Sequence, residues 1–323
     1  MKLVKNVLIS IFFVSMAFIG MSCGEKSDEK SSSEVIKIGI SVPSADHGWT
    51  AGLGWWAQKT AEELNAEDKN LKFFVVQANN GTKQVSDVED LMVKGINALV
   101  ILPHNPKTLQ RAIQEAHKSG VYTVVVDREL EIPAQDVFVA GDNPGLGRIG
   151  GEWMVKQMEG KGKMVVIEGM QIPINKQRVD AFNEVVKKHK DIEILGSQPA
   201  DWSTEKALTV MENFLQKHSQ IDAVWCQDDD MLKGVLKAIS EAKRTEIKTV
   251  MGGAGAKWVV KKIIDGDPSI RATVTYNPSM VATGIKMCVK GIRGEKQPAR
   301  HIIPAELVDD LNAKSFYFPE SPY

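Results

Sequence analysis

Cysteine is scarce in this chain of 323 residues, which contains only three. Cys23 lies near the N-terminus, whereas Cys226 and Cys288 are far from it and from each other. Two such thiols do not define a disulfide framework, although they can pair in an oxidising compartment. We therefore expect Cys226 and Cys288 to be buried and free.

The chain also lacks an excess of charge of either sign. Lysine and arginine together number 40, aspartate and glutamate 41, and the formal net charge is −1. Nucleic-acid-binding domains usually present a concentrated excess of basic residues, and this composition has no such footprint. The sequence therefore predicts no nucleic-acid partner.

Motifs for metal and nucleotide chemistry are absent or misplaced. The six histidines show no metal-ligand spacing, and there is no H-E-x-x-H, P-loop or G-x-S-x-G motif. Residues 145–150, GLGRIG, match the dinucleotide fingerprint G-x-G-x-x-G literally. However, Asp142, Asn143 and Pro144 separate the preceding strand from the first glycine, so we expect these glycines inside a helix, where they permit close packing. The sequence predicts no metal and no cofactor.

One long hydrophobic run occurs, close to the N-terminus. Lys2 and Lys5 precede the apolar residues 7–21, VLISIFFVSMAFIGM. This run is short for a membrane span, which needs about 20 apolar residues, and no second run follows it. We therefore expect residues 1–22 to be a secretory signal peptide.

A polar stretch follows the apolar run. Residues 24–34, GEKSDEKSSSE, contain no large apolar side chain, so they cannot bury a core and are predicted to be disordered. The small residues before Cys23 resemble the lipobox of bacterial lipoproteins, in which the cysteine is acylated and becomes the mature N-terminus. That resemblance implies a lipid-anchored linker over residues 23–34. The alternative is a plain exported protein with an incidental thiol.

From residue 35 onward, short strand-like runs alternate with helix-like runs. The first strand, residues 36–43, alternates isoleucine with other residues and ends at a proline, which cannot donate to a sheet ladder. Residues 50–65 then carry apolar side chains at helical spacing. The unit recurs as far as RATVTY, which ends at Tyr276, and residues 277–291 are predicted to form one more helix. Repeated βα units predict an α/β fold with parallel sheets in two successive lobes.

Polar and aromatic residues gather at the ends of these predicted strands. Small ligands usually bind beside the carboxyl ends of the strands of open α/β sheets. Carboxylates and guanidinium groups pair with hydroxyls, and an indole face covers the C–H face of a sugar ring, so this set suits a polyhydroxylated ligand. Taken singly, each residue also fits a structural role as an ion pair or a core aromatic. The residues so placed are Asp46, His47, Trp49, Asp127, Arg128, Asp142, Asn143, Arg178, Trp202, Asp228, Asp229, Asp230, Tyr276 and Asn277.

The order of these segments resembles the ribose and galactose group of type I periplasmic sugar-binding proteins. The matching segments cover nearly the whole chain after residue 34. They are IGIS with Trp49, QANN, ILP, VVDRE, AGDNPGLGRIGGEWM, the R-x-x-AF of residues 178–182, SQPADW and QDDDM. In that family two Rossmann-like lobes, joined by three crossings of the chain, close on a sugar, and an ABC permease or a chemoreceptor reads the bound protein.

The resemblance implies an N-terminal lobe of residues 35–141 plus 277–303 and a C-terminal lobe of residues 142–276 plus 304–323. The three-stranded hinge then lies near Gly141, Tyr276 and Pro304. Carried over position by position, the family's ligand contacts fall on Asp46 or His47, Trp49, Thr50, Asp127, Arg128, Arg178, Trp202, Asp228, Ala254 and Tyr276. Ribose-type members have Asp at the position of Ala254, Gln at that of Tyr276 and Asn at that of Asp228. The missing hydroxyl acceptor at Ala254 speaks against ribose itself.

We therefore expect a monomeric solute-binding protein without enzymatic activity, lipid-anchored through Cys23 in the periplasm or on the outer face of the cell membrane. It is predicted to bind a monosaccharide or sugar alcohol and to deliver it to an ABC importer. Two alternatives remain open. One is an exported sugar sensor that feeds a chemoreceptor or a membrane kinase, and the other is an exported hydrolase that uses the acidic residues 228–230 with Asp46 as a second carboxylate.

Overall fold

The computed structural model of the protein describes residues 35–323. The predicted signal peptide, residues 1–22, and the predicted linker with Cys23, residues 23–34, lie outside the described residues. Over the described part of the chain, none of the helices combines the length and the hydropathy that crossing a membrane requires.

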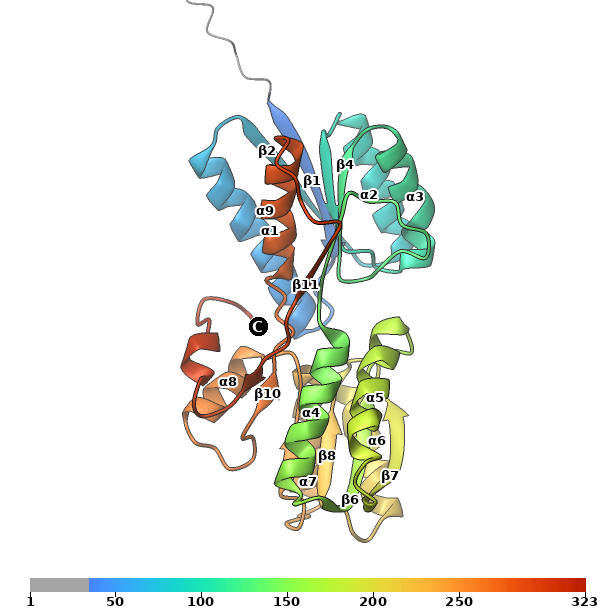
Figure 1. Ribbon diagram of the computed structural model, residues 1–323, viewed down its shortest axis with the longest axis vertical. Helices are drawn as coiled ribbons and strands as arrows, with labels where there is room; N and C mark the ends of the chain where they lie inside the picture. Colours follow the sequence, from blue (N-terminus) through green and yellow to red (C-terminus); the bar gives the residue numbers. More distant parts are fainter. Residues whose placement is uncertain (1–34) are drawn as a thin grey trace, which may run out of the picture. The chain divides into compact units, whose positions relative to one another are not determined.

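The first sheet has six parallel strands in the order β11-β5-β4-β3-β1-β2 (Figure 1). Its strands are β1 (Ile36–Pro43), β2 (Leu71–Ala78), β3 (Ala98–Ile101), β4 (Tyr122–Val126), β5 (Val137–Gly141) and β11 (Arg300–Ile303). The helices that accompany it are α1 (Gly48–Glu67), α2 (Gly81–Val93), α3 (Pro106–Lys118) and α9 (Met280–Ile292). We call this sheet and these helices the N-terminal lobe.

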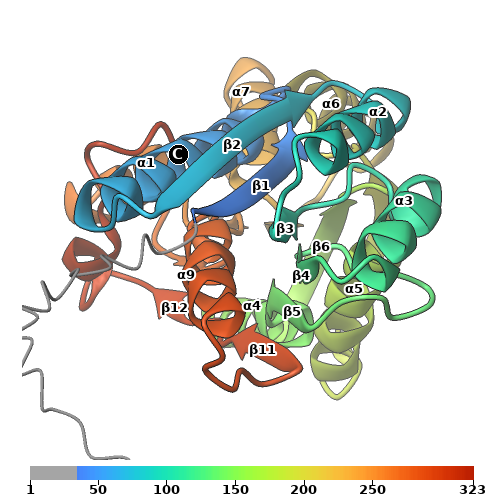
Figure 2. The ribbon, with the colours of Figure 1, turned by 90° about the horizontal axis from the view of Figure 1, so that it is seen from above.

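Both faces of the first sheet are covered by helices, α1 and α9 on one side and α2 and α3 on the other (Figure 2). The central strand β3 is therefore apolar at every position and fully buried. Successive side chains of a strand point to opposite faces. Accordingly, Val100 packs in the core with α1 and α9, whereas Leu99 and Ile101 pack in the core with α2 and α3.

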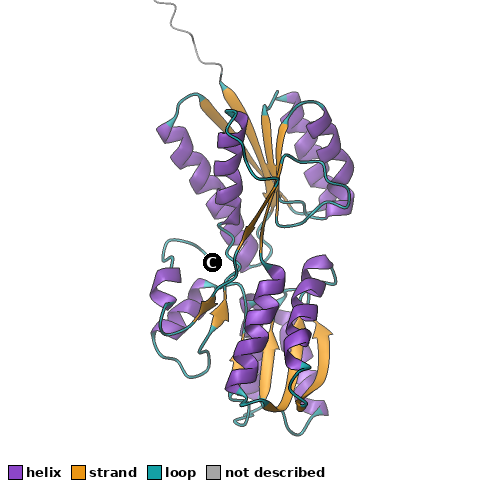
Figure 3. Ribbon diagram, viewed as in Figure 1, coloured by secondary structure: helices purple, strands orange, loops and turns teal. Residues whose placement is uncertain are grey.

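The second sheet has four parallel strands in the order β7-β6-β8-β9. They are β6 (Lys161–Glu168), β7 (Asp191–Pro199), β8 (Ala223–Cys226) and β9 (Thr249–Met251). Its helices, drawn in purple in Figure 3, are α4 (Asn143–Gln157), α5 (Pro173–Val186), α6 (Thr204–Lys217), α7 (Asp229–Glu241) and α8 (Lys257–Ile264). The pairs α4 with α5 and α6 with α7 pack against each other. We call this group, with the short strands described next, the C-terminal lobe.

The glycine motif of residues 145–150 lies inside α4, as the sequence predicts. These glycines allow α4 to approach its neighbours closely. A Cβ atom on Gly147 would lie 2.1 Å from the carbonyl oxygen of Arg178 in α5, and one on Gly150 would lie 2.9 Å from Nε1 of Trp225. Trp225 itself stacks on Phe182, with ring centroids 3.8 Å apart. The motif therefore serves helix packing in this fold.

The chain passes between the lobes three times, which confirms the predicted hinge. The first crossing joins β5 to α4, and the amide of Asp142 donates to the carbonyl of Ile303 in the third crossing over 2.9 Å. The second joins β10 (Thr273–Val274) to α9. After the third, β12 (Leu307–Val308) pairs antiparallel with β10, and a 3₁₀ turn, η1 (Ala313–Phe316), packs on α8. The limits of the lobes given above remain a prediction.

The two cysteines among residues 35–323 are buried and free, as expected. Burial raises the pKa of both thiols, Cys226 and Cys288. A thiol in such surroundings is a poor nucleophile because it stays protonated.

Candidate ligand-binding site

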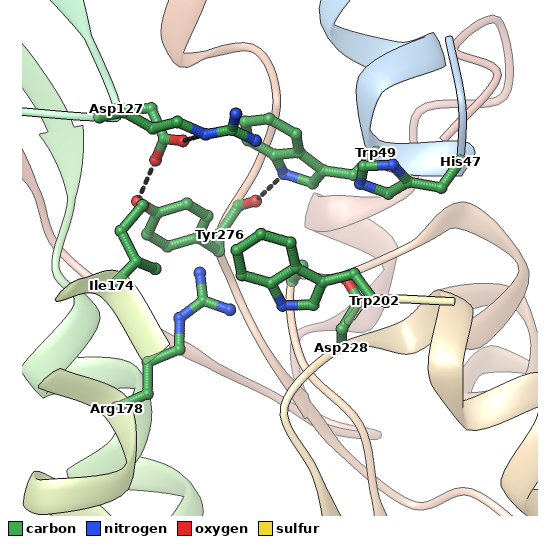
Figure 4. Close-up of a pocket in the computed structure, with 10 residues that line it drawn as sticks. His47, Trp49, Asp127, Ile174, Arg178, Trp202, Asp228 and Tyr276 are labelled. Carbon is green, nitrogen blue, oxygen red and sulfur yellow. Dashed lines mark hydrogen bonds and ion pairs between the residues drawn. The ribbon is translucent and has the colours of Figure 1, made fainter. Parts of the chain in front are cut away.

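A cavity of about 30 Å³ lies where the two lobes meet at the hinge (Figure 4). Both lobes contribute charged and aromatic side chains to its wall. The lining residues are His47, Trp49, Asp127 and Arg128 from the N-terminal lobe, Ile174, Arg178, Trp202, Asp228 and Ala254 from the C-terminal lobe, and Tyr276 from the hinge. The structure thus gathers most of the residues selected from the sequence.

Strand ends and helix starts position these side chains. Asp127 and Arg128 directly follow β4, and Asp228 directly precedes α7. Three lining residues adopt left-handed backbone conformations, with φ of 65° at Asp127, 60° at Trp202 and 85° at Ala254. Such conformations are uncommon for residues other than glycine and cluster at functional sites. Their concentration around one cavity is the pattern expected of a binding site.

A chain of hydrogen bonds runs through the cavity wall from one lobe to the other. The hydroxyl of Tyr276 donates to Oδ1 of Asp127 over 2.5 Å and accepts from Nδ2 of Asn143 over 3.1 Å. Nε of Arg178 donates to Oδ1 of Asn143 over 2.8 Å, and its guanidinium carbon lies 4.4 Å from the centre of the Tyr276 ring. Burial raises the pKa of Tyr276 well above its ordinary value, so the phenol stays a donor. The network connects the two lobes through the hinge.

Trp49 is held by the opposite lobe and by the hinge. Its indole Nε1 donates to the carbonyl of Tyr276 over 2.8 Å, and its backbone amide donates to Oδ2 of Asp230 in α7 over 3.1 Å. Both Trp49 and Trp202 are buried. Figure 4 shows the two indole rings on either side of the cavity, with Arg178 below. Two buried flat rings and a guanidinium group provide the surroundings that a sugar ring needs.

The three consecutive aspartates have different roles. Asp228 lines the cavity and caps α7 by accepting from the amides of Asp230 and Met231 over 2.7 and 3.1 Å. Burial, with the nearby Asp230 carboxylate, raises the pKa of Asp228 to about 6. Asp229 points away and accepts from the amide of Ala256 over 2.7 Å. Burial raises the pKa of Asp229 well above its ordinary value, which favours the neutral carboxyl, and its bonds to Ala256 and Thr273 give it a structural role.

His47 lies opposite this acidic group, at the start of α1. Burial lowers its pKa, but the hydrogen bond to Asp46 and the charges of Asp228 and Asp230 outweigh burial, and the net pKa is raised. The raised pKa favours a positive charge on His47 near neutral pH.

Two predicted contacts, Asp46 and Thr50, do not line the cavity. The Asp46 side chain is largely exposed and bonds to Nδ1 of His47 over 2.5 Å and to Oγ1 of Thr50 over 2.8 Å. The two residues therefore hold the start of α1 and the His47 ring. Conversely, the sequence selection missed Ile174, which lies four residues before Arg178 in α5. That spacing places both on one helix face and was the available signal.

Residues 38–296 match the family model described as a periplasmic binding protein domain. The chain belongs to this family. A D-allose-binding periplasmic protein of Escherichia coli is 30% identical over 239 residues, which cover 71% of this chain and 76% of the relative. A ribose import binding protein of the same organism is 29% identical over 273 residues, covering 84% and 90%. A solved ABC transporter solute binding protein of Mycobacterium smegmatis with bound glycerol is 31% identical, with a TM-score of 0.79, and the match covers 89% and 98%.

As a periplasmic binding protein, the chain falls in a family whose name denotes an exported, periplasmic location and solute binding. The predicted α/β fold with two lobes of parallel sheet is confirmed by the structure and by its similarity to solved solute-binding proteins. Within residues 35–323, no three histidine, cysteine or acidic side chains are grouped so as to hold a metal ion.

Proposed function

We propose that this periplasmic binding protein binds a monosaccharide or sugar alcohol and delivers it to an ABC importer. The observation that carries the proposal is the cavity at the hinge, where carboxylates, guanidinium groups and two indole rings converge from both lobes. Relatives named for ribose, D-allose and xylitol support the same class of ligand. No step of bond making or breaking is part of this function.

In the proposed complex, the ligand bridges the two lobes. Asp127 and Arg128 of the N-terminal lobe pair with hydroxyls on one side, and Arg178 and Asp228 of the C-terminal lobe pair with hydroxyls on the other. Trp49 and Trp202 cover the apolar faces of the ligand. A ligand that contacts both lobes only when they are together stabilises that arrangement by its differential affinity.

We propose that the lobes separate to admit the ligand and then close on it. The residues that line the cavity come from both lobes, and a chain of hydrogen bonds joins the lobes at its wall. Bending at the three crossings opens such a site without disturbing either sheet. We propose residues 35–141 plus 277–303 and residues 142–276 plus 304–323 as the two moving bodies.

The N-terminal residues complete the proposal. We infer that residues 1–22 are removed as a signal peptide, that Cys23 is acylated, and that residues 23–34 tether a monomeric binding domain to the membrane. The lipobox-like residues before Cys23 support this reading. Fractionation of cells expressing the protein tests it, because Cys23→Ser is expected to move the exported protein from the membrane to the soluble fraction. Retention at the membrane contradicts the anchor.

Calorimetric titration tests the ligand class. Residues 24–323 are titrated with pentoses, hexoses, deoxy sugars, polyols and cyclitols, and each solution is then analysed for chemical change. We expect saturable one-to-one binding of at least one compound, recovered unaltered. If none of the compounds binds, the proposal is contradicted. If a compound is recovered in a chemically altered form, the exported hydrolase is favoured instead.

Substitutions test the site. We expect Arg178→Ala and Trp202→Ala each to abolish or greatly weaken binding while the protein stays folded, because each removes a direct contact. Arg148→Ala is the matched control, since this arginine of α4 is half exposed and does not line the cavity. An isotherm unchanged by either site substitution removes the site assignment.

A further inference from the structure

The last described residues, 318–323, pack against both lobes. After the third crossing the chain packs on α8 of the C-terminal lobe through η1, and residues 318–323 then lie against α1 of the N-terminal lobe. Figures 1 and 2 mark the end of the described chain beside α1. We call these residues the 318–323 segment.

Lys257, at the start of α8, holds the segment on the C-terminal lobe. Its Nζ donates to the carbonyl of Pro319 over 3.3 Å and to the carbonyl of Ser321. Ser321 is fully buried, and its hydroxyl accepts from the amide of Tyr323 over 3.2 Å. These bonds give the segment a defined path on this lobe.

Three further contacts join the same segment to α1. The ring of Phe318 meets that of Trp56 edge to face, with centroids 6.0 Å apart and an interplanar angle of 84°. Oε2 of Glu320 accepts from Nζ of Lys59 over 2.9 Å. Tyr323 is buried against Gly52, where an added Cβ would lie 2.7 Å from the tyrosine Cβ.

We propose that the 318–323 segment ties the two lobes together and sets how readily the ligand site opens. α1 packs on the first sheet and moves with it. Lys257 begins α8, which follows β9 and is joined to α7 by the bond from the amide of Ala256 to Asp229, so it moves with the second sheet. Separation of the lobes therefore strains or breaks one set of the contacts. Trp56 and Lys59 are then positioning residues for ligand binding, although neither lines the cavity.

The expected size of the effect follows from the contacts. An edge-to-face aromatic pair shifts a two-state equilibrium about 2- to 12-fold. The Lys59–Glu320 pair adds little, because Glu320 is 76% exposed. The apparent affinity for a ligand changes by the same factor as the population of the binding-competent arrangement.

Measuring the distance between two spin labels tests, without any ligand, whether the 318–323 segment holds the two lobes together. Labels are placed on the full chain at Lys107→Cys and Gln177→Cys, exposed positions on opposite sides of the cavity of about 610 Å³ that adjoins the hinge. Cys23→Ser removes the remaining reactive thiol, since Cys226 and Cys288 are buried. Phe318→Ala/Glu320→Gln is the test variant.

The control variant is Leu311→Ala/Glu63→Gln. Leu311 is 88% exposed, and Glu63 lies 4.0 Å from the same Lys59 but within α1. We expect the ratio of short to long label distances to fall about 2- to 12-fold in the test variant and to stay unchanged in the control. Equal ratios in the two folded variants overturn the proposal. A failure of sugar binding is a separate result, because this measurement needs no sugar.

Discussion

Asp228→Asn is expected to stabilise the ligand-free protein at neutral pH. The ordinary pKa of 3.8 applies to Asp228 in the unfolded chain, and burial raises it to about 6 in the folded protein. Between these two pH values the folded state holds the proton that the unfolded state releases, so the free energy of unfolding falls as pH rises. At 1.36 kcal/mol per pH unit, the loss is about 3 kcal/mol by pH 7.

The amide of Asn keeps the acceptor that caps α7 but removes the buried charge. We therefore expect Asp228→Asn to be more stable than the parent at pH 7 by up to about 3 kcal/mol and of similar stability at pH 4. His47 adds a slope of the same sign in the parent, because its raised pKa gives stability that is present below pH 6.5 and lost above its folded pKa. This slope is smaller in Asp228→Asn, since the charge of Asp228 helps to raise the pKa of His47.

Urea unfolding at pH 4, 5, 6 and 7 provides the measurement. The matched control is Asp142→Asn, which also changes a helix-capping aspartate, here at the start of α4 and 30% exposed. We expect that control to show the parent's dependence on pH. The reasoning would be refuted if the free energy of unfolding depended on pH in the same way in the parent and in Asp228→Asn. The variant is also expected to bind ligand about 10- to 100-fold more weakly, because a charged acceptor for hydroxyls is lost.

Three further outcomes follow from close contacts in the structure. Gly147→Ala is expected to destabilise the protein by about 2 kcal/mol in denaturant unfolding, because its Cβ would lie 2.1 Å from the backbone oxygen of Arg178. Tyr276→Phe should lower the free energy of unfolding by about 1–3 kcal/mol, since Asp127 loses a buried donor. Cys288 should react with a thiol reagent only after unfolding, as measured by the rate of modification in native buffer and in urea. An unchanged free energy of unfolding for Gly147→Ala or Tyr276→Phe would contradict the contact that the substitution changes. Rapid modification of Cys288 in native buffer would contradict its burial.

The sequence predicted the sheets and the hinge because βα units carry strong local signals. Alternating or continuous apolar runs identify the strands, and prolines and glycines mark their ends. The carboxyl ends of parallel strands meet at one edge of each sheet, so Asp127, Arg128 and Trp202 were selected without knowledge of their neighbours. The run RATVTY predicted a strand that contains β10, whereas the two-residue strand β12 was missed, since so short a pairing leaves no periodic pattern.

The separate roles of neighbouring residues were not predictable. Asp228 and Asp229 are adjacent, yet the turn of a helix start directs one toward the cavity and the other toward Ala256. Asp46 was predicted as a ligand contact, and the structure adds its bonds to His47 and Thr50, which the sequence does not reveal. The contact of residues 318–323 with α1 joins segments more than 250 positions apart. Hydropathy patterns report local structure and do not predict which distant segments pack together.

The place of α9 and β11 in the first sheet bears on how the chain folds after export. Strands β1 to β5 precede the whole C-terminal lobe, whereas α9, which packs on β3, β4 and β5, and the neighbouring edge strand β11 come after residue 279. A chain that emerges N-terminus first therefore shows a sheet face that only α1 covers and an unpaired strand edge until nearly all of it has been secreted. The second sheet and helices α4 to α8 come from one uninterrupted stretch and reach their partners sooner. The first part of the chain to appear is thus the last to become resistant to proteases, and for that interval it is the part most exposed to aggregation.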